Sequence, residues 1–456
     1  MITMIKKIGN IQKKNLPSII IARMSMSIKI ITIFISFLIA SDQIPSADQD
    51  HPILLKNATV HTISNGIKKN TDILFDSGKI IAIGKNLNLP VDTEVINTTN
   101  KHIFPGLISA STVLGLQEIG AVRATRDYAE VGDFNPNVRA NVSYNPDSEL
   151  IPISRSNGVL LALSIPRSGL ISGQSSLMSL DGWTWEDATF KHPVGLHLFW
   201  PSMNIPKNKK NKSNSKDDKR LASIQKIDNI FDESRSYLKL KISNSQSFKH
   251  NLKLEGLIPV LNNEIPIFIH ANEVRQIEAA VYWSIRQDVK MILVGGKDSW
   301  RVTDLLKDNN IPVIYTQTHS TPSRRFENFD QSFTTPNQLY RAGVKFCISN
   351  SESSFQTPHI RNLPYHAAKA GSYGLPWSEA IRSITLSTAE ILGVNDRVGS
   401  IDIGKNATLF IADGDILDVR TQVEQVFIDG KKVDMSDRHK VLFDKYQKKY
   451  QQLNNK

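Results

Sequence analysis

The chain has 456 residues, of which 40% are hydrophobic and 22% are charged. These proportions are those of a soluble globular protein, and they exclude fibrous and disordered chains as classes. A chain of this length exceeds the size at which one hydrophobic core usually stays undivided. We therefore expect one large domain with a smaller companion.

The formal charge of +11 is concentrated in two segments. Residues 1–40 hold six basic and no acidic residues, so the rest of the chain has 49 basic against 44 acidic residues, or +5. Residues 204–220, with seven basic and two acidic residues, account for that remainder. The body is close to neutral, which excludes a broad basic face and argues against nucleic acid as a partner.

Residues 1–47 have the layout of a signal peptide and leader. Basic residues come first, an apolar run follows at residues 30–40, and no acidic residue precedes Asp42. That run is shorter than the roughly 20 apolar residues that span a bilayer. Cleavage after Ala40 or Ala47 would leave a periplasmic or secreted protein without a stable membrane span. The alternative is a buried strand or an uncleaved anchor.

Both ends of the remaining chain are rich in short β segments. Residues 53–103 contain several such segments separated by glycine and proline, and residues 398–433 repeat this texture. Two similar ends around a different middle predict one small β-domain built from both. Its expected parts are residues 48–104 and 395–435.

The middle of the chain, residues 105–394, alternates strands with helices. Its clearest strands start 24, 22 and 32 residues apart, at Ile267, Met291, Val313 and Lys345. This spacing is typical of βα units in a parallel sheet. Their apolar runs require burial on both faces, which helices outside a barrel or sheet would provide.

Two segments stand apart from this pattern. Residues 204–220 have almost no large apolar side chains, which predicts a Lys-rich disordered insertion. Residues 436–456 predict a charged terminal helix that docks through an apolar face of Val441, Leu442, Phe443 and Tyr446.

Four segments together resemble the amidohydrolase superfamily, and in particular its imidazolonepropionase-like branch. They are HIFPGLISAST (102–112), SITLSTAEILGV (383–394), RVGSIDIGKNATLFIADGD (397–415) and VFIDGKKV (426–433). The resemblance implies a distorted (β/α)8 TIM-like barrel with a small β-sandwich built from both chain ends. It also implies one or two divalent metals, such as zinc, at the carboxyl ends of the barrel strands.

Such a metal would lower the pKa of a bound water and polarise a substrate carbonyl, so that hydroxide attacks an amide or cyclic amide. The chemistry needs imidazoles and carboxylates that converge from several strands. After PGLI the family usually places two histidines at the end of the first strand. This chain has Ser111 and Val113 there, so both imidazoles are missing.

Other family positions are also altered. Gly295 stands on the sixth strand where a histidine is often found, and Asn350 or Ser351 stands where a catalytic aspartate would accept a proton. An amide has no basic lone pair at neutral pH, so that role is lost. His270 matches the histidine of the fifth strand. It is the one metal ligand we expect, and His270 and Asn350 are the remaining catalytic candidates. The alternative for His270 is a hydrogen-bonded wall residue.

Further polar residues fall near the predicted strand exits. Asp298, His319, Glu352 and Glu273 could join His270 in an irregular site, or they could be solvated residues of the rim. The segment after the first strand would line the barrel mouth in the family. The resemblance therefore implies that Arg123, Arg126 and Tyr144 contact a polar ligand. Glu273, near a predicted strand exit, is a further candidate for this contact. The alternative is a loop held by its own ion pairs.

Two functions remain open from the sequence. The first is a hydrolase of carbon–nitrogen bonds in non-peptide or cyclic amides, with weak activity and either no cofactor or a single zinc ion. The second is a noncatalytic pseudoenzyme that binds a small amide or peptide-like ligand, or that partners a metal-competent homologous amidohydrolase subunit.

Overall fold

A computed structural model describes residues 43–203, 213–243 and 248–454. The described residues from Ile44 onward belong to one compact unit. The predicted signal peptide, up to residue 42, lies outside the described residues. Among the helices that are described, none combines the length and the apolar character needed to cross a membrane.

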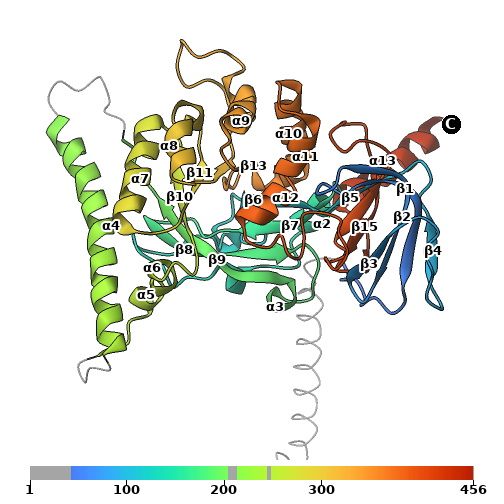
Figure 1. The fold of residues 1–456 in the computed structure, drawn as a ribbon, viewed down its shortest axis with the longest axis horizontal. Coiled ribbons are helices and arrows are strands. Elements are labelled where there is room, and N and C mark those ends of the chain that lie inside the picture. Colours follow the sequence, from blue (N-terminus) through green and yellow to red (C-terminus); the bar gives the residue numbers. More distant parts are fainter. Residues whose placement is uncertain (1–42, 204–212, 244–247, 455–456) are drawn as a thin grey trace, which may run out of the picture. The chain divides into compact units, whose positions relative to one another are not determined.

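One eight-stranded sheet joins both ends of the chain (Figure 1). The N-terminal part supplies β1 (Ile53–His61), β2 (Ile67–Asp76), β3 (Lys79–Gly84), β4 (Glu94–Asn97) and β5 (His102–Pro105). The C-terminal part supplies β14 (Leu409–Ala412), β15 (Val423–Ile428) and β16 (Lys431–Val433). The order is β16-β15-β14-β5-β1-β2-β3, with β4 beside β1, and antiparallel pairing of β14 with β5 joins the two parts.

This sheet folds back on itself. Phe75 of β2 and Phe427 of β15 are four places apart in the strand order, yet their ring centroids lie 5.2 Å apart. Together with Ile73, Ile103 and Leu409 they form one buried apolar cluster. A small domain shared by both chain ends is therefore present.

The second sheet is a nearly closed barrel. Its strands are β6 (Leu107–Thr112), β7 (Val159–Ser164), β8 (Ile171–Ser179), β9 (Thr189–Phe199), β10 (Ile267–Ala271), β11 (Met291–Gly295), β12 (Val313–Tyr315) and β13 (Phe346–Ile348). Neighbours pair in chain order and in parallel, except that β8 runs antiparallel to β7 and β9. The first and last strands are bridged where the Ala110 N–H donates to Ser349 Oγ at 3.0 Å. The predicted barrel is confirmed, and the reversed β8 is its distortion.

Helices cover the outside of the barrel (Figure 1). Those after β10 are α7 (Val274–Gln287), α8 (Thr303–Asp308), α9 (Gln331–Ala342), α10 (Leu363–Ser372), α11 (Trp377–Ser383) and α12 (Leu386–Ile391). Before β10 lie α2 (Leu150–Arg155), α3 (Trp185–Ala188), α4 (Ser213–Ile242), α5 (Leu252–Glu255) and α6 (Ile258–Leu261). Short 3-10 segments are η1 (Arg123–Thr125), η2 (Ala140–Ser143), η3 (Ser299–Arg301) and η4 (Thr357–Asn362), and α13 (Arg438–Asn454) ends the described chain.

The predicted insertion at 204–220 differs from the structure in its second half. Residues 204–212 lie outside the described residues, but α4 begins at Ser213. Lysine has a good helix propensity, so a Lys-rich segment can extend a helix whose later turns are packed. Those turns are anchored, because Phe231 is fully buried and Trp283 Nε1 donates to Asp228 Oδ1 at 2.9 Å.

The expected docking of the terminal helix is wrong. The helix exists as α13, but Val441, Phe443 and Tyr446 are 60%, 66% and 49% exposed. None of the described residues of α13 is buried.

The packed barrel interior leaves no space for a side chain at Gly195 of β9, and this can be tested. A Cβ atom there would lie 2.2 Å from Cε2 of Phe268, which is fully buried. Gly195→Ala should therefore lower the free energy of unfolding by about 1–3 kcal/mol, because the ring has no free space to enter. The midpoint of urea unfolding measures this.

Gly371→Ala in α10 is the matched control. Its added Cβ would meet Ala380 Cβ at 3.8 Å, an ordinary contact. Alanine is also a better helix former than glycine, so the midpoint of urea unfolding of Gly371→Ala should equal or exceed that of wild type. Equal midpoints for the two variants would contradict the packing that we describe.

Candidate functional site

Polar side chains gather where the barrel strands end. The carboxyl ends of parallel barrel strands meet at one rim, which is where active sites of such barrels form. His197 lies near the end of β9 and His270 near the end of β10. Glu352 follows β13, and Ser111 is the second last residue of β6. Four separate strands thus bring these residues together.

These residues form a continuous chain of contacts. His197 Nδ1 lies 2.9 Å from His270 Nε2, and His270 Nδ1 lies 3.5 Å from Glu352 Oε1. On the other side, Ser111 Oγ donates to Glu352 Oε2 at 3.3 Å. We call His197, His270 and Glu352 the mouth chain. The two expected candidates His270 and Glu352 are thus in direct contact.

Aromatic rings hold the two imidazoles in place. The ring of His270 stacks on Phe199 at 4.0 Å, and the ring of His197 stacks on Phe268 at 4.7 Å. His197 and His270 are 1% and 8% exposed. Because the rings cannot rotate freely, the direction of each ring nitrogen is fixed by packing.

Electrostatics assign the protons of the mouth chain. Burial raises the pKa of Glu352, but the charge and hydrogen bond of His270 outweigh it and hold that pKa at about 2. Burial, with repulsion from His270, holds the pKa of His197 well below its usual value. Glu352 is therefore a carboxylate and His197 is neutral at pH 7. A carboxylate only accepts, so His270 Nδ1 carries the proton that faces it.

The mouth chain does not fit the divalent metal that the family resemblance implies. Both ring nitrogens of His270 are already occupied, one by Glu352 and one by His197. Within residues 43–203, 213–243 and 248–454, no three His, Cys, Asp or Glu side chains are arranged to hold a metal ion. A side chain at Gly295 would also clash, because its Cβ would lie 2.6 Å from Asn272 Oδ1.

A second polar group surrounds Asn350, directly after β13. Its Nδ2 lies 3.3 Å from His366 Nε2 and 3.4 Å from the carbonyl oxygen of His359. His366 stacks on His319, with ring centroids 4.2 Å apart. Burial, with repulsion from His319, lowers the pKa of His366 to about 3. Among the described residues, Asn350 Oδ1 and His366 Nδ1 are buried and have no hydrogen-bond partner.

The residues expected to contact a ligand are spread more widely. Arg123 lies in η1 and Arg126 directly after it, and both are exposed. Tyr144 is 4% exposed and packs on Gly115, where an added Cβ would lie 2.3 Å from the ring. Glu273 forms a capping box at the start of α7 with Gln276. Ligand binding by these four residues stays a prediction.

Sequence reasoning missed His197 and His366. His197 lies at the end of a strand, as His270 does, so its position could have been found by the same argument. His366 lies in α10 and has no signal of this kind. Asp298, by contrast, is held in the structure by Arg324, whose Nη1 donates to it at 2.9 Å.

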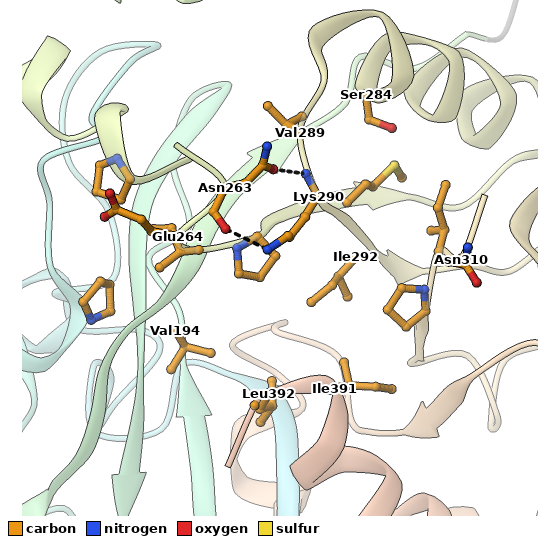
Figure 2. Close-up of a pocket in the computed structure, with 18 of the residues that line it drawn as sticks. Val194, Asn263, Glu264, Ser284, Val289, Lys290, Ile292, Asn310, Ile391 and Leu392 are labelled. Carbon is orange, nitrogen blue, oxygen red and sulfur yellow. Dashed lines mark hydrogen bonds between the residues drawn. The ribbon is translucent and has the colours of Figure 1, made fainter. Parts of the chain in front are cut away.

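A cavity of about 1180 Å³ opens at the opposite end of the barrel (Figure 2). Pro266, Lys290 and Pro312, which precede β10, β11 and β12, line it. Among its polar groups, Lys290 Nζ donates to the carbonyl oxygen of Asn263 at 2.8 Å. The cavity lies at the amino ends of the strands and therefore away from His270.

The pKa of His366 predicts acid sensitivity. Below pH 6.5 the unfolded chain binds a proton on this histidine, whereas the folded chain keeps it neutral down to about pH 3. The free energy of unfolding that depends on His366 is therefore fully present above pH 6.5 and is lost as the pH falls toward 3. We expect wild type to melt at a lower temperature at pH 4 than at pH 7. His366→Gln, which cannot titrate, should narrow that difference, while His250→Gln at an exposed site should leave it unchanged. An equal difference in all three proteins would contradict the burial of an uncharged His366.

Comparisons with known proteins agree with the fold. The model for the amidohydrolase family matches residues 332–433. The amidohydrolase tasK of Hapsidospora irregularis is 20% identical over 400 residues, which are 79% of this chain and 39% of that protein. The chain thus spans well under half of the length of that relative.

Solved structures extend the likeness to the whole barrel. An amidohydrolase from Thermotoga maritima MSB8 superposes with a TM-score of 0.75 and 27% identity, over 84% of this chain and 99% of that one. A molinate hydrolase shares the fold with a TM-score of 0.52 and 15% identity, over 85% of this chain and 96% of that one. The matched family model, the relative and the Thermotoga structure are all amidohydrolases, and the barrel with a sheet built from both chain ends has the fold of that superfamily.

Proposed function

We propose that this chain is a noncatalytic amidohydrolase-fold protein that binds a small amide or peptide-like ligand at the barrel mouth. The observation that carries the proposal is the mouth chain, in which one ring nitrogen of His270 contacts Glu352 and the other contacts His197. The alternative is the family reaction, hydrolysis of a carbon–nitrogen bond. Placement in the imidazolonepropionase-like branch is part of the same proposal and rests on the four sequence segments.

The residues at the mouth argue against the family reaction. That reaction needs a water whose pKa is lowered by a metal and a base that takes its proton. The nitrogen of His270 that could act as a base, Nε2, accepts a hydrogen bond from His197 if His270 is neutral. Asn350 offers an amide in place of the family carboxylate. His270 could take a proton from water only after its contact with His197 is broken, and the amide of Asn350 has no basic lone pair at neutral pH.

The hydrogen-bonding capacity left at Asn350 and His366 supports an amide ligand. His366 Nε2 accepts from Asn350 Nδ2, which leaves the proton of His366 on Nδ1. Asn350 Oδ1 is then an unpaired acceptor and His366 Nδ1 an unpaired donor. An amide carries one N–H and one C=O, and so matches this pair. Each unpaired buried group costs about 1–3 kcal/mol, which a bound amide would offset.

The place of action is part of the proposal. The basic and apolar layout of residues 1–40 supports export, so we propose that the ligand is met in the periplasm or outside the cell. A homologous, metal-competent subunit stays a predicted partner.

Metal content tests the loss of hydrolytic chemistry. We expect the untagged mature protein, produced with zinc available and then desalted, to hold well below one zinc ion per chain by plasma mass spectrometry. The content of His270→Ala should be the same as wild type. One zinc ion per wild-type chain that disappears in His270→Ala would contradict the proposal and restore the hydrolase alternative.

Calorimetric titration tests whether the barrel mouth binds a small amide or peptide-like ligand. In calorimetric titration with a panel of dipeptides and cyclic amides, His366→Phe should weaken the best ligand by about tenfold, because one hydrogen bond is lost. Gly371→Ala, on the same helix, should bind as wild type does. Equal affinity in His366→Phe, or turnover of the ligand by wild type, would exclude the proposed role of the mouth.

A further inference from the structure

The terminal helix α13 stands in water along its whole length. It runs from Arg438 to Asn454, and none of its described residues is buried. Figure 1 shows it next to the marked C-terminal end of the chain. Its start is fixed, because Asp437 Oδ1 accepts from the N–H groups of His439 and Lys440 at 2.8 and 3.1 Å. A 17-residue helix without packing is marginally stable in water, so a covered state is expected.

One face of α13 is apolar and aromatic. The exposed fractions along it are 38% for Leu442, 66% for Phe443, 49% for Tyr446, 60% for Tyr450 and 54% for Leu453. Residues three and four positions apart share a helix face, so these five side chains form one stripe. We call them the α13 stripe. Phenylalanine and leucine supply apolar area, and the two tyrosines supply rings with a polar tip.

The rest of α13 is strongly basic. Arg438, Lys440, Lys445, Lys448 and Lys449 stand against the single acid Asp444, which gives the helix a net charge of +4 with His439 neutral. Lys449 borders the stripe, because its Nζ lies 5.7 Å from the ring centroid of Tyr446 and 5.8 Å from that of Tyr450. The positive charge therefore reaches the edge of the apolar face.

We propose that α13 lies on the surface of an anionic phospholipid bilayer, with the stripe at the boundary between headgroups and acyl chains. A stripe of Phe, Leu and Tyr flanked by lysines is what such an interfacial helix requires. Lipid phosphates complement the net charge of +4, and each nearby basic residue adds attraction. A second copy fits less well, because two helices of equal positive charge would repel each other along the seam.

Vesicle binding by the full mature chain tests this proposal. We expect co-sedimentation with vesicles of phosphatidylglycerol and phosphatidylethanolamine, weaker binding in high salt, and little binding to phosphatidylcholine. Phe443→Ser with Tyr450→Ser removes stripe area, and Lys445→Glu with Lys448→Glu reverses charge. Each pair should weaken binding by at least about tenfold. Because α13 contributes no buried residue, both pairs should melt at the wild-type temperature.

Matched controls change the same residue types elsewhere. Phe326→Ser with Phe329→Ser alters two rings that are each 73% exposed, and Lys68→Glu with Lys69→Glu alters two exposed lysines of β2. Both should bind vesicles as wild type does. Absence of binding to anionic vesicles, or equal binding in the α13 variants, would overturn the proposal. It would also be overturned by a lipid-free dimer in sedimentation velocity that Phe443→Ser with Tyr450→Ser dissociates, because the stripe would then bind a second copy.

Discussion

The contact between His270 and Glu352 is the interaction on which the mouth of this barrel depends. A carboxylate at a largely enclosed site stays charged only beside a partner that compensates its lost hydration, and His270 is that partner. Once Glu352 is ionised, a proton of His270 is fixed on Nδ1, and Nε2 faces His197 Nδ1 at 2.9 Å. The same nitrogen atoms cannot also converge on a metal ion. The contact between His270 and Glu352 therefore limits what this barrel end can do.

The packing of the barrel does not depend on the contact between His270 and Glu352. Phe268 fills the interior next to Gly195, and Ala110 closes the seam to Ser349 whatever stands at position 111. The residues that build the scaffold are thus distinct from those that would carry out the chemistry, which is why a family framework can persist around an altered site. At Gly295 the backbone itself has changed in a way that excludes the family histidine. With φ at +98° and Asn272 against its missing Cβ, this position has no room for the imidazole expected there.

The sequence was sufficient for the features that depend on local pattern. Strands at Ile267, Met291 and Val313 follow from apolar runs, and the sheet shared by both ends follows from their similar β texture. The reversal of β8 could not be predicted, because an antiparallel pair is decided by the connections around it and not by its own residues. The pairing of His270 with Glu352 is likewise set by a contact across 82 positions. For α13 the sequence predicted the helix and three of the five stripe residues, but nothing in an amphipathic pattern says what will cover that face.

The two regions that we assign to ligands share one short segment, η4. The carbonyl oxygen of His359 accepts from Asn350 at 3.4 Å, and two residues later Arg361 Nη1 lies 2.8 Å from His439 Nδ1 at the start of α13. An element that two distant sites both contact is able to carry energetic coupling between them, and η4 contacts both. A ligand at the mouth and a surface against α13 would then act on two positions of the same six-residue segment, His359 and Arg361. The contact at His439 is exposed and that at Asn350 is part-buried, so less packing holds η4 on the α13 side than on the side of the mouth.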